Sequence, residues 1–128
     1  MPADTEKITI NVSVVDLGKI DLLVDEGSYA GRTDFVRTAI RGQLDKQSEL
    51  GPAVARGAYV VGVLSYDRDR LEHLASRRER VRIVVLGMLV IGRDVAPELA
   101  ASTIESIKVR GVFRASPEIK AALADRMQ

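Results

Sequence analysis

The chain has 128 residues, a net charge of +1, 46% apolar and 29% charged residues, and no cysteine, a composition that suits one globular domain or two small ones. The absence of cysteine excludes disulfide bonds and thiolate metal sites. The acidic start MPADTEKI has no apolar core, and no stretch has the roughly eighteen apolar residues that span a bilayer, so we expect a cytoplasmic protein without a secretory signal or membrane contact.

Residues 7–13, within the stretch KITINVSV, alternate strictly between polar and apolar side chains. A period of two predicts a β-strand with one buried side. No second strand follows nearby, so this strand needs a partner from elsewhere. Its apolar side is Ile8, Ile10 and Val12, and its polar side is Lys7, Thr9 and Asn11.

A helix is predicted over about residues 15–26. Ser13 followed by Asp16 has the spacing of a helix cap, and Gly27 suits the left-handed residue that often ends a helix. Spacings of three and four put the apolar residues on one face of this helix. They are Leu17, Ile20, Leu23 and Val24.

A second helix is predicted over about residues 33–47. Thr33 is the expected N-cap, and Asp34 is placed favourably in the first turn. The apolar stripe of this helix is Phe35, Val36, Ala39, Ile40 and Leu44.

The rest of the chain alternates between strands and helices after a Gly/Pro-containing hinge at residues 48–57. We therefore expect an α+β protein with a first domain at residues 1–47 and a βαβαβα domain at residues 58–128. Strands are predicted at 58–66, 81–92 and 104–115, and helices at 67–80, 96–103 and 116–127, the last with Ser116 as N-cap and Pro117 at the first helical position.

Each strand of the second domain has a central glycine, namely Gly62, Gly87 and Gly111. The period of about 20 to 25 residues is typical of a strand–helix solenoid of the leucine-rich type, although any β–α alternation with such glycines looks similar. Glycines inside apolar strands indicate bulges or close packing rather than ligand contacts.

The strand at residues 7–13 is predicted to pair with its own copy in a symmetric dimer. Each chain then supplies one strand to a two-stranded antiparallel ribbon, which four helices cover. About 40 residues bury too little surface to fold alone, so the dimer is expected to be obligate. Its shared core would contain Ile8, Ile10, Val12, Leu17, Ile20, Val24, Phe35, Val36 and Ile40.

This order of strand, helix, turn and helix resembles the ribbon-helix-helix DNA-binding proteins of the MetJ/Arc/CopG type. The stretch KITINVSV is similar to the family's ribbon, and GSYAGRTDFVRTAIRGQL is similar to its turn and second helix. The resemblance covers the N-terminal third of the chain. It implies a bacterial-type, sequence-specific regulator that binds double-stranded DNA and needs no cofactor.

The resemblance also implies which residues contact DNA. Base contacts from the ribbon fall on Lys7, Thr9 and Asn11. Phosphate contacts fall on the side chains of Arg32 and Thr33 and on the backbone N–H groups of Asp34 and Phe35. One feature opposes DNA binding, because residues 1–50 contain six Lys/Arg and nine Asp/Glu and so carry a charge of −3.

The second domain is similar in layout to the regulatory domain of nickel-responsive repressors, but His73 is the single histidine of the chain, so no comparable metal site is expected. No arrangement of catalytic residues is present, and we expect no enzyme. Three strands leave two edges, which predicts higher oligomers through this domain. A regulatory role, in which the domain senses an effector, is the alternative. The basic stretch at residues 77–82 is a solvated helix end, or else a contact to flanking DNA or to an acidic partner.

A second function stays open from the sequence. The ribbon-helix-helix fold would then serve mainly for dimerisation, and the C-terminal strands would build an assembly, as in a scaffold protein. An antitoxin is a variant of this alternative, although antitoxin tails are usually disordered and this one has the pattern of a folded domain.

Overall fold

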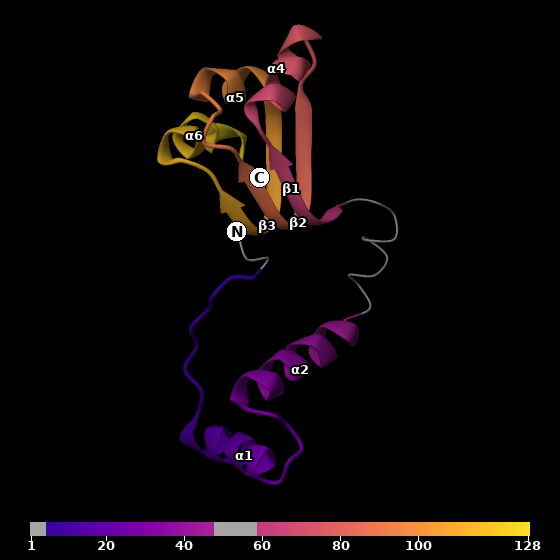
Figure 1. Ribbon diagram of the computed structural model, residues 1–128, viewed down its shortest axis with the longest axis vertical. Helices are drawn as coiled ribbons and strands as arrows, with labels where there is room; N and C mark the ends of the chain where they lie inside the picture. Colours follow the sequence, from indigo (N-terminus) through magenta and orange to yellow (C-terminus); the bar gives the residue numbers. More distant parts are fainter. Residues whose placement is uncertain (1–4, 48–58) are drawn as a thin grey trace. The chain divides into compact units, whose positions relative to one another are not determined.

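The computed structural model describes residues 5–47 and 59–128 (Figure 1). Contacts divide the chain into two compact units. The helical unit is Lys7–Pro52, and the strand–helix unit is Ala53–Gln128 together with Met1–Glu6. The predicted hinge at residues 48–57 lies outside the described residues. No helix within the described ranges is long and apolar enough to cross a membrane.

The first helix of the helical unit, α1, spans Val14–Asp25. Its start is fixed by Ser13, whose Oγ accepts a hydrogen bond from the Asp16 N–H at 3.1 Å, so the predicted cap is confirmed. Gly27 follows the helix with φ of +82°, as expected for a left-handed residue at a helix end. Local sequence signals therefore determine both ends of α1.

The second helix, α2, spans Arg32–Asp45 and begins earlier than predicted. The residue before it is Gly31, so the prediction of Thr33 as N-cap is wrong. The cause lies in Asp34, whose carboxylate accepts a hydrogen bond from the Ala30 N–H at 3.0 Å. Asp34 is the third residue of the helix, and its bond to an N–H just before the helix holds the entering chain much as the returning bond of a capping box does.

Residues 7–13 form neither helix nor strand in the single chain. A β-strand is defined by its pairing, and no strand of the described residues pairs with this segment. The strand predicted here requires a second copy of the chain, so it stays a prediction.

The strand–helix unit contains the three predicted strands and three predicted helices. The last predicted helix is shorter than expected, because the chain leaves α6 and returns to the sheet, where the Gln128 N–H donates to the Ile107 carbonyl at 2.8 Å. The elements are β1 (Val60–Tyr66), α4 (Arg68–Ser76), β2 (Val81–Ile91), α5 (Pro97–Thr103), β3 (Ile104–Arg114), α6 (Pro117–Ala122) and a 3₁₀ turn, η1 (Ala124–Arg126).

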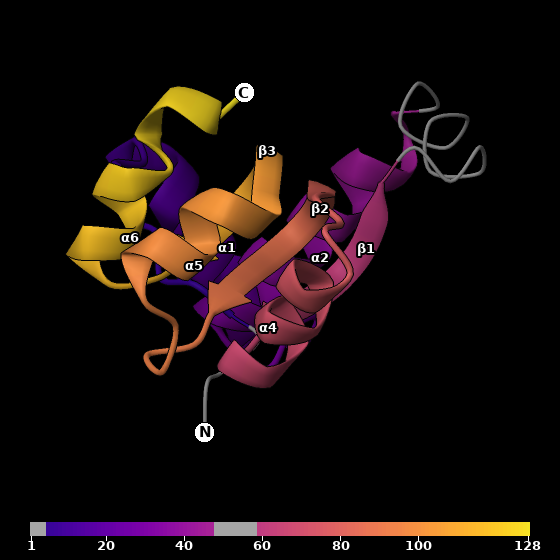
Figure 2. The ribbon, with the colours of Figure 1, turned by 90° about the horizontal axis from the view of Figure 1, so that it is seen from above.

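The three strands form one parallel sheet in the order β1-β2-β3. The helices that connect them contact one another in the same order, α4 with α5 and α5 with α6. Figure 2 shows the three helices side by side along the sheet. Each strand with its following helix therefore forms one coil of a repeating structure, as the solenoid interpretation predicts.

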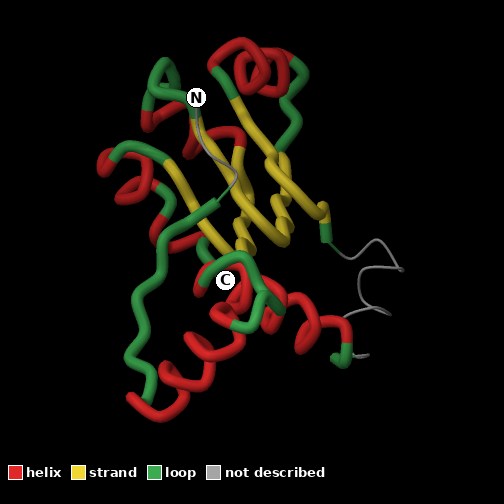
Figure 3. The backbone as a smooth tube through the Cα atoms, turned by 60° about the horizontal axis from the view of Figure 1, so that its bottom comes forward, coloured by secondary structure: helices red, strands yellow, loops and turns green. Residues whose placement is uncertain are grey.

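The central glycines stand opposite one another, with Gly62 beside Gly87 and Gly87 beside Gly111. All three have positive φ, of 122°, 138° and 129°. Figures 1 and 3 show β2 and β3 turning sharply in mid-course, with both ends of each strand on the same side of the bend. Glycine permits this corner because a side chain is strained at such φ values.

The core of the strand–helix unit lies between the sheet and its helices. Odd-numbered strand residues such as Ile83, Val85 and Leu89 are buried there, on the same side as Leu71 of α4 and Ala100 of α5. The complete buried cluster is Tyr66, Leu71, Ile83, Val85, Leu89, Ile91, Val95, Ala100, Ile104, Ile107, Ile119 and Leu123.

The two edges of the sheet differ. The β3 edge is covered by the chain end, where Met127 forms a parallel bridge to Ile107. Within residues 5–47 and 59–128, no strand pairs with the outer edge of β1. Its side chains are uncharged, and Val60 and Val61 are 51% and 60% exposed. Among the described residues, the β1 edge is therefore an apolar edge that no other strand covers.

Candidate nucleic-acid interface

The segment that should form the DNA-reading ribbon is exposed along its whole length. Lys7, Thr9 and Asn11, the predicted base-contacting residues, are all exposed. The alternate residues Ile8 and Ile10 are also 71% and 66% exposed. In the single chain the apolar side of this segment faces solvent, and covering it with a partner would be favourable.

The two helices of the helical unit do not close a core between them. Neither α1 nor α2 has a buried residue. The rings of Tyr29 and Phe35 form an edge-to-face pair with centroids 5.0 Å apart, next to the turn between the helices. Of the predicted dimer core, Leu17, Ile20, Val24 and Phe35 are half-buried, and Ile8, Ile10, Val12, Val36 and Ile40 are exposed.

The N-terminus of α2 offers backbone donors at a different position from the predicted one. The first intrahelical bond runs from the Phe35 N–H to the Gly31 carbonyl at 3.1 Å. The Phe35 N–H is therefore already bonded within the helix in the free chain, and its phosphate contact stays a prediction. The amides of Arg32, Thr33 and Asp34 precede this first bond and point out of the helix start.

Arg32 joins the two helices of the helical unit. Its Nε and Nη2 donate to the two carboxylate oxygens of Asp21 at 2.7 and 2.8 Å. The hydrogen bond from Arg32 holds the pKa of the Asp21 carboxyl below its usual value of 3.8. The guanidinium group predicted for a phosphate thus holds α2 to α1. Sequence reasoning missed Asp21 because a separation of eleven residues across a turn gives no periodic signal.

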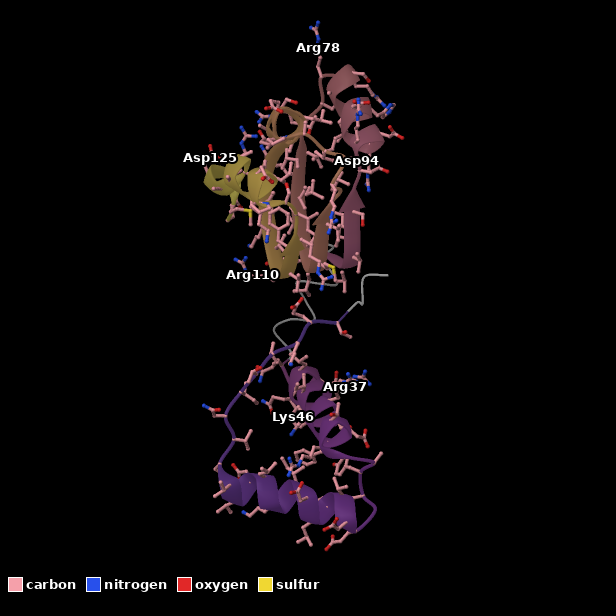
Figure 4. The ribbon with its side chains drawn as sticks, turned by 60° about the vertical axis from the view of Figure 1, so that its left-hand side comes forward. Arg37, Lys46, Arg78, Asp94, Arg110 and Asp125 are labelled. Carbon is pink, nitrogen blue, oxygen red and sulfur yellow. The ribbon has the colours of Figure 1, made fainter. Side chains whose placement is uncertain are left out.

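Two of the acids that oppose DNA binding have partners of their own. The Asp34 carboxylate accepts from Ala30, and the Glu6 carboxylate bonds Arg114 at 3.2 Å within the strand–helix unit. Arg37 and Lys46 extend from α2 as exposed side chains (Figure 4). The charge of Glu6 is therefore balanced by Arg114, whereas Asp34, which is bonded to a neutral N–H group, keeps its negative charge.

A family model described as the ribbon-helix-helix transcriptional regulator family matches residues 3–120 of the chain. The chain belongs to this family. The match extends through the strand–helix unit into α6, so a resemblance restricted to the N-terminal third is too narrow. This ribbon-helix-helix protein is thus a transcriptional regulator by family, and its C-terminal coils are part of the family pattern. No curated protein and no solved structure matches it.

The basic stretch at residues 77–82 of this ribbon-helix-helix protein is partly neutralised by its own unit. Arg77 pairs with Glu79 at 3.0 Å, and Arg82 pairs with Glu105 at 2.5 Å. The hydrogen bond from Arg82 lowers the pKa of the Glu105 carboxyl. His73 lies exposed on α4, and no group of three or more acidic or histidine side chains in the described ranges could hold a metal ion.

Proposed function

We propose that this protein is a homodimeric, sequence-specific DNA-binding regulator in which residues 7–13 of two copies pair as an antiparallel ribbon. The observation that carries the proposal is the exposed, alternating segment at residues 7–13 beside two helices without buried residues, in a chain of the ribbon-helix-helix family. Pairing with a second copy satisfies the backbone of the segment and covers its apolar side.

Base recognition is assigned to Lys7, Thr9 and Asn11. A two-stranded ribbon fits into the major groove, and alternate residues on its outer side reach the base edges. Lysine donates to guanine O6 and N7, asparagine can pair with adenine at N6 and N7, and threonine offers a hydroxyl and a methyl group. The three side chains together can therefore distinguish base pairs.

Phosphate contacts are assigned to the start of α2. The amides of Thr33 and Asp34 and the Thr33 hydroxyl are the donors there, and a helix N-terminus favours an anion. Arg32 adds its charge and its Nη1 donors, because the pair with Asp21 uses only Nε and Nη2. This site fixes the position of the ribbon on the duplex without reading sequence.

The test is binding of the full chain to DNA selected from a random pool, followed by footprinting. Asn11→Ala is expected to weaken the selected site by about tenfold to a hundredfold and to relax the base preference, because a bidentate base contact contributes about 1–3 kcal/mol. Lys7→Ala is expected to lower both affinity and the dependence of affinity on salt concentration.

Lys46→Ala is the matched control for Lys7→Ala. It also removes one positive charge, but at the C-terminal end of α2, whereas the proposed phosphate site is at the N-terminal end. It should change specific binding little. Absence of salt-dependent binding to any DNA, or an equal loss in Lys7→Ala and Lys46→Ala, would contradict the proposed function.

We further propose that dimers associate into tetramers through the β1 edge. An uncharged strand edge pairs readily with another strand, and a symmetric pair of such edges is antiparallel. The same edge favours the second candidate function, an assembly protein in which the helical unit only dimerises. Selection of DNA from a random pool distinguishes the regulator from the assembly protein, because the assembly protein would form tetramers without selecting any DNA sequence.

A further inference from the structure

An open groove of about 850 Å³ lies at the carboxyl ends of β2 and β3, beside the start of α6. Three of the residues that line it are cationic, namely Arg93, Arg114 and Lys120. They come from three different segments of the chain, the loop after β2, the end of β3 and helix α6. The carboxyl ends of parallel strands are a frequent place for ligands in α/β proteins, because the loops there diverge.

The groove has an unbalanced charge. None of its lining residues is Asp or Glu. Asp94 follows Arg93 in the chain, but its carboxylate accepts a hydrogen bond from the Arg68 N–H at 3.3 Å, outside the groove lining. Of the three lining cations, Arg114 alone is paired with a carboxylate of the described residues, that of Glu6, so they leave a net positive charge that favours an anionic ligand over a neutral or cationic one.

The rest of the lining is mainly apolar. Phe113, Val90 and Ile91 contribute to the surface between the cations, and the Lys120 ammonium group lies 5.8 Å from the centre of the Phe113 ring. Small-molecule sites typically combine an apolar wall with a few polar groups that fix orientation. The ligand class that fits is a small organic anion, with a carboxylate or phosphate group on an apolar body.

Arg114 already holds a carboxylate of the chain itself. Glu6 pairs with it at 3.2 Å, and both side chains stay largely accessible, with exposures of 51% for Glu6 and 41% for Arg114. An exposed pair of this kind contributes little to stability, so an incoming anion can displace the Glu6 carboxylate at low cost. Glu6 directly precedes Lys7, the first residue of the proposed ribbon.

We propose that this groove binds a small organic anion through Arg93, Arg114 and Lys120, in competition with Glu6. We regard this anion as an effector, that is, a ligand that regulates DNA binding. This part of the proposal rests on the proposed function. Displacement of the Glu6 carboxylate releases the residue that directly precedes the ribbon segment and so connects the groove to the part of the chain proposed to contact DNA.

The test is isothermal titration of the full chain, at constant ionic strength, with benzoate, phenyl phosphate and neutral benzamide. Benzoate or phenyl phosphate is expected to bind, and benzamide is expected not to bind. Which of the two anions binds more tightly tells whether the groove prefers a carboxylate or a phosphate. If neither anion binds more tightly than benzamide, the proposal is overturned.

Variants locate the site. Lys120→Ala and Arg93→Ala are each expected to weaken binding of the preferred anion about tenfold, the usual effect of losing a charged hydrogen-bond donor. Glu6→Gln should strengthen it about two- to fivefold, because the competing carboxylate is gone. If these residues only stabilised the fold, Glu6→Gln would not strengthen anion binding while Lys120→Ala and Arg93→Ala weaken it.

Arg78→Asn is the charge-matched control. Arg78 lies in the turn before β2, with φ of +54°, which asparagine tolerates, and it is not among the residues that line the groove. Its side chain points outward from the strand–helix unit (Figure 4). If Arg78→Asn weakens anion binding as much as Lys120→Ala and Arg93→Ala do, general charge and not the groove attracts the anion, and the proposal fails.

DNA binding by the same variants distinguishes failure of this proposal from failure of the proposed function. Without added anion, Arg93→Ala and Lys120→Ala should bind DNA like the unmodified protein. A loss as large as that of Lys7→Ala would make the groove a DNA-phosphate surface and overturn the anion site. Failure of the proposed function alone would leave anion binding intact while DNA selection yields no preferred sequence.

Discussion

Gly62 and Gly87 lie opposite each other in the parallel pair of β1 and β2, and the Gly62 carbonyl occupies the place of a Cβ at residue 87. The same relation recurs between Gly87 and Gly111 in the next pair. The corner of each coil is therefore packed backbone to backbone, and its tightness depends on glycine in the coil that follows.

Gly87→Ala is expected to destabilise the strand–helix unit strongly. The new methyl group would overlap the Gly62 carbonyl, and the residue would also keep a φ of +138°, so the cost combines overpacking with backbone strain. The expected loss is about 3 kcal/mol or more in the free energy of unfolding, measured by urea denaturation of the full chain.

Gly62→Ala and Gly18→Ala separate the two causes. Gly62 has φ of +122° but no atom of the described residues within 4 Å of its added Cβ, so it should show the strain alone and a smaller loss. Gly18 lies inside α1 with open space around it, and alanine there should leave stability unchanged or raise it by about 0.5–1 kcal/mol. Equal losses at residues 62 and 87 would contradict the backbone-packing explanation.

The ribbon dimer is tested by a pair of neighbouring substitutions. Ile10→Lys places a charge in the proposed dimer core, at a cost of about 3 kcal/mol or more, so dimers should dissociate and helix content should fall. Thr9→Lys adds the same charge on the proposed outer side and should leave the dimer intact. Light scattering and far-ultraviolet circular dichroism measure both effects. Intact dimers in Ile10→Lys would rule out the proposed ribbon.

The sequence predicts the strand–helix unit well because its signals are local. Apolar runs indicate the strands, Ser116 as N-cap and Pro117 as first residue indicate the start of α6, and the repeated glycines indicate close packing between coils. The bend at each glycine was not predicted, since it depends on a carbonyl from the preceding coil. The short final helix was not predicted either, because Gln128 pairs with Ile107, far away in the sequence.

The candidate interface was harder to predict. The alternation at residues 7–13 indicates which side chains lie on the same side of the segment. The strand that is proposed to pair with this segment belongs to a second copy of the chain. The role of Arg32 depends on Asp21, and the start of α2 depends on the bond from Ala30 to Asp34, both of which are contacts across a turn. The groove at Arg93, Arg114 and Lys120 joins three separate segments, which no local pattern reveals.

The Asp21–Arg32 pair gives the helical unit a definite response to acid. Because the pKa of Asp21 is lower in the folded chain than its usual value of 3.8, the pair contributes stability above pH 3.8 and loses it as pH falls through the lowered pKa. The Asp21 carboxyl resonance should therefore titrate below pH 3.8 by NMR. In Arg32→Gln it should return toward 3.8. A midpoint at or above 3.8 in the unmodified protein would contradict the pairing.

The β1 edge makes a prediction about assembly. Val61 and Val63 are 60% and 46% exposed on a strand whose outer edge pairs with no strand of the described residues. Lysine at both positions should block edge-to-edge pairing because charged edges resist it. Light scattering should then show tetramers for the unmodified full chain and dimers for the double variant. Val14→Lys, at an exposed position of α1, is the control and should keep the tetramer. Dimers alone at high concentration of the unmodified protein would rule out β1 pairing between dimers and leave the ribbon as the proposed contact between copies.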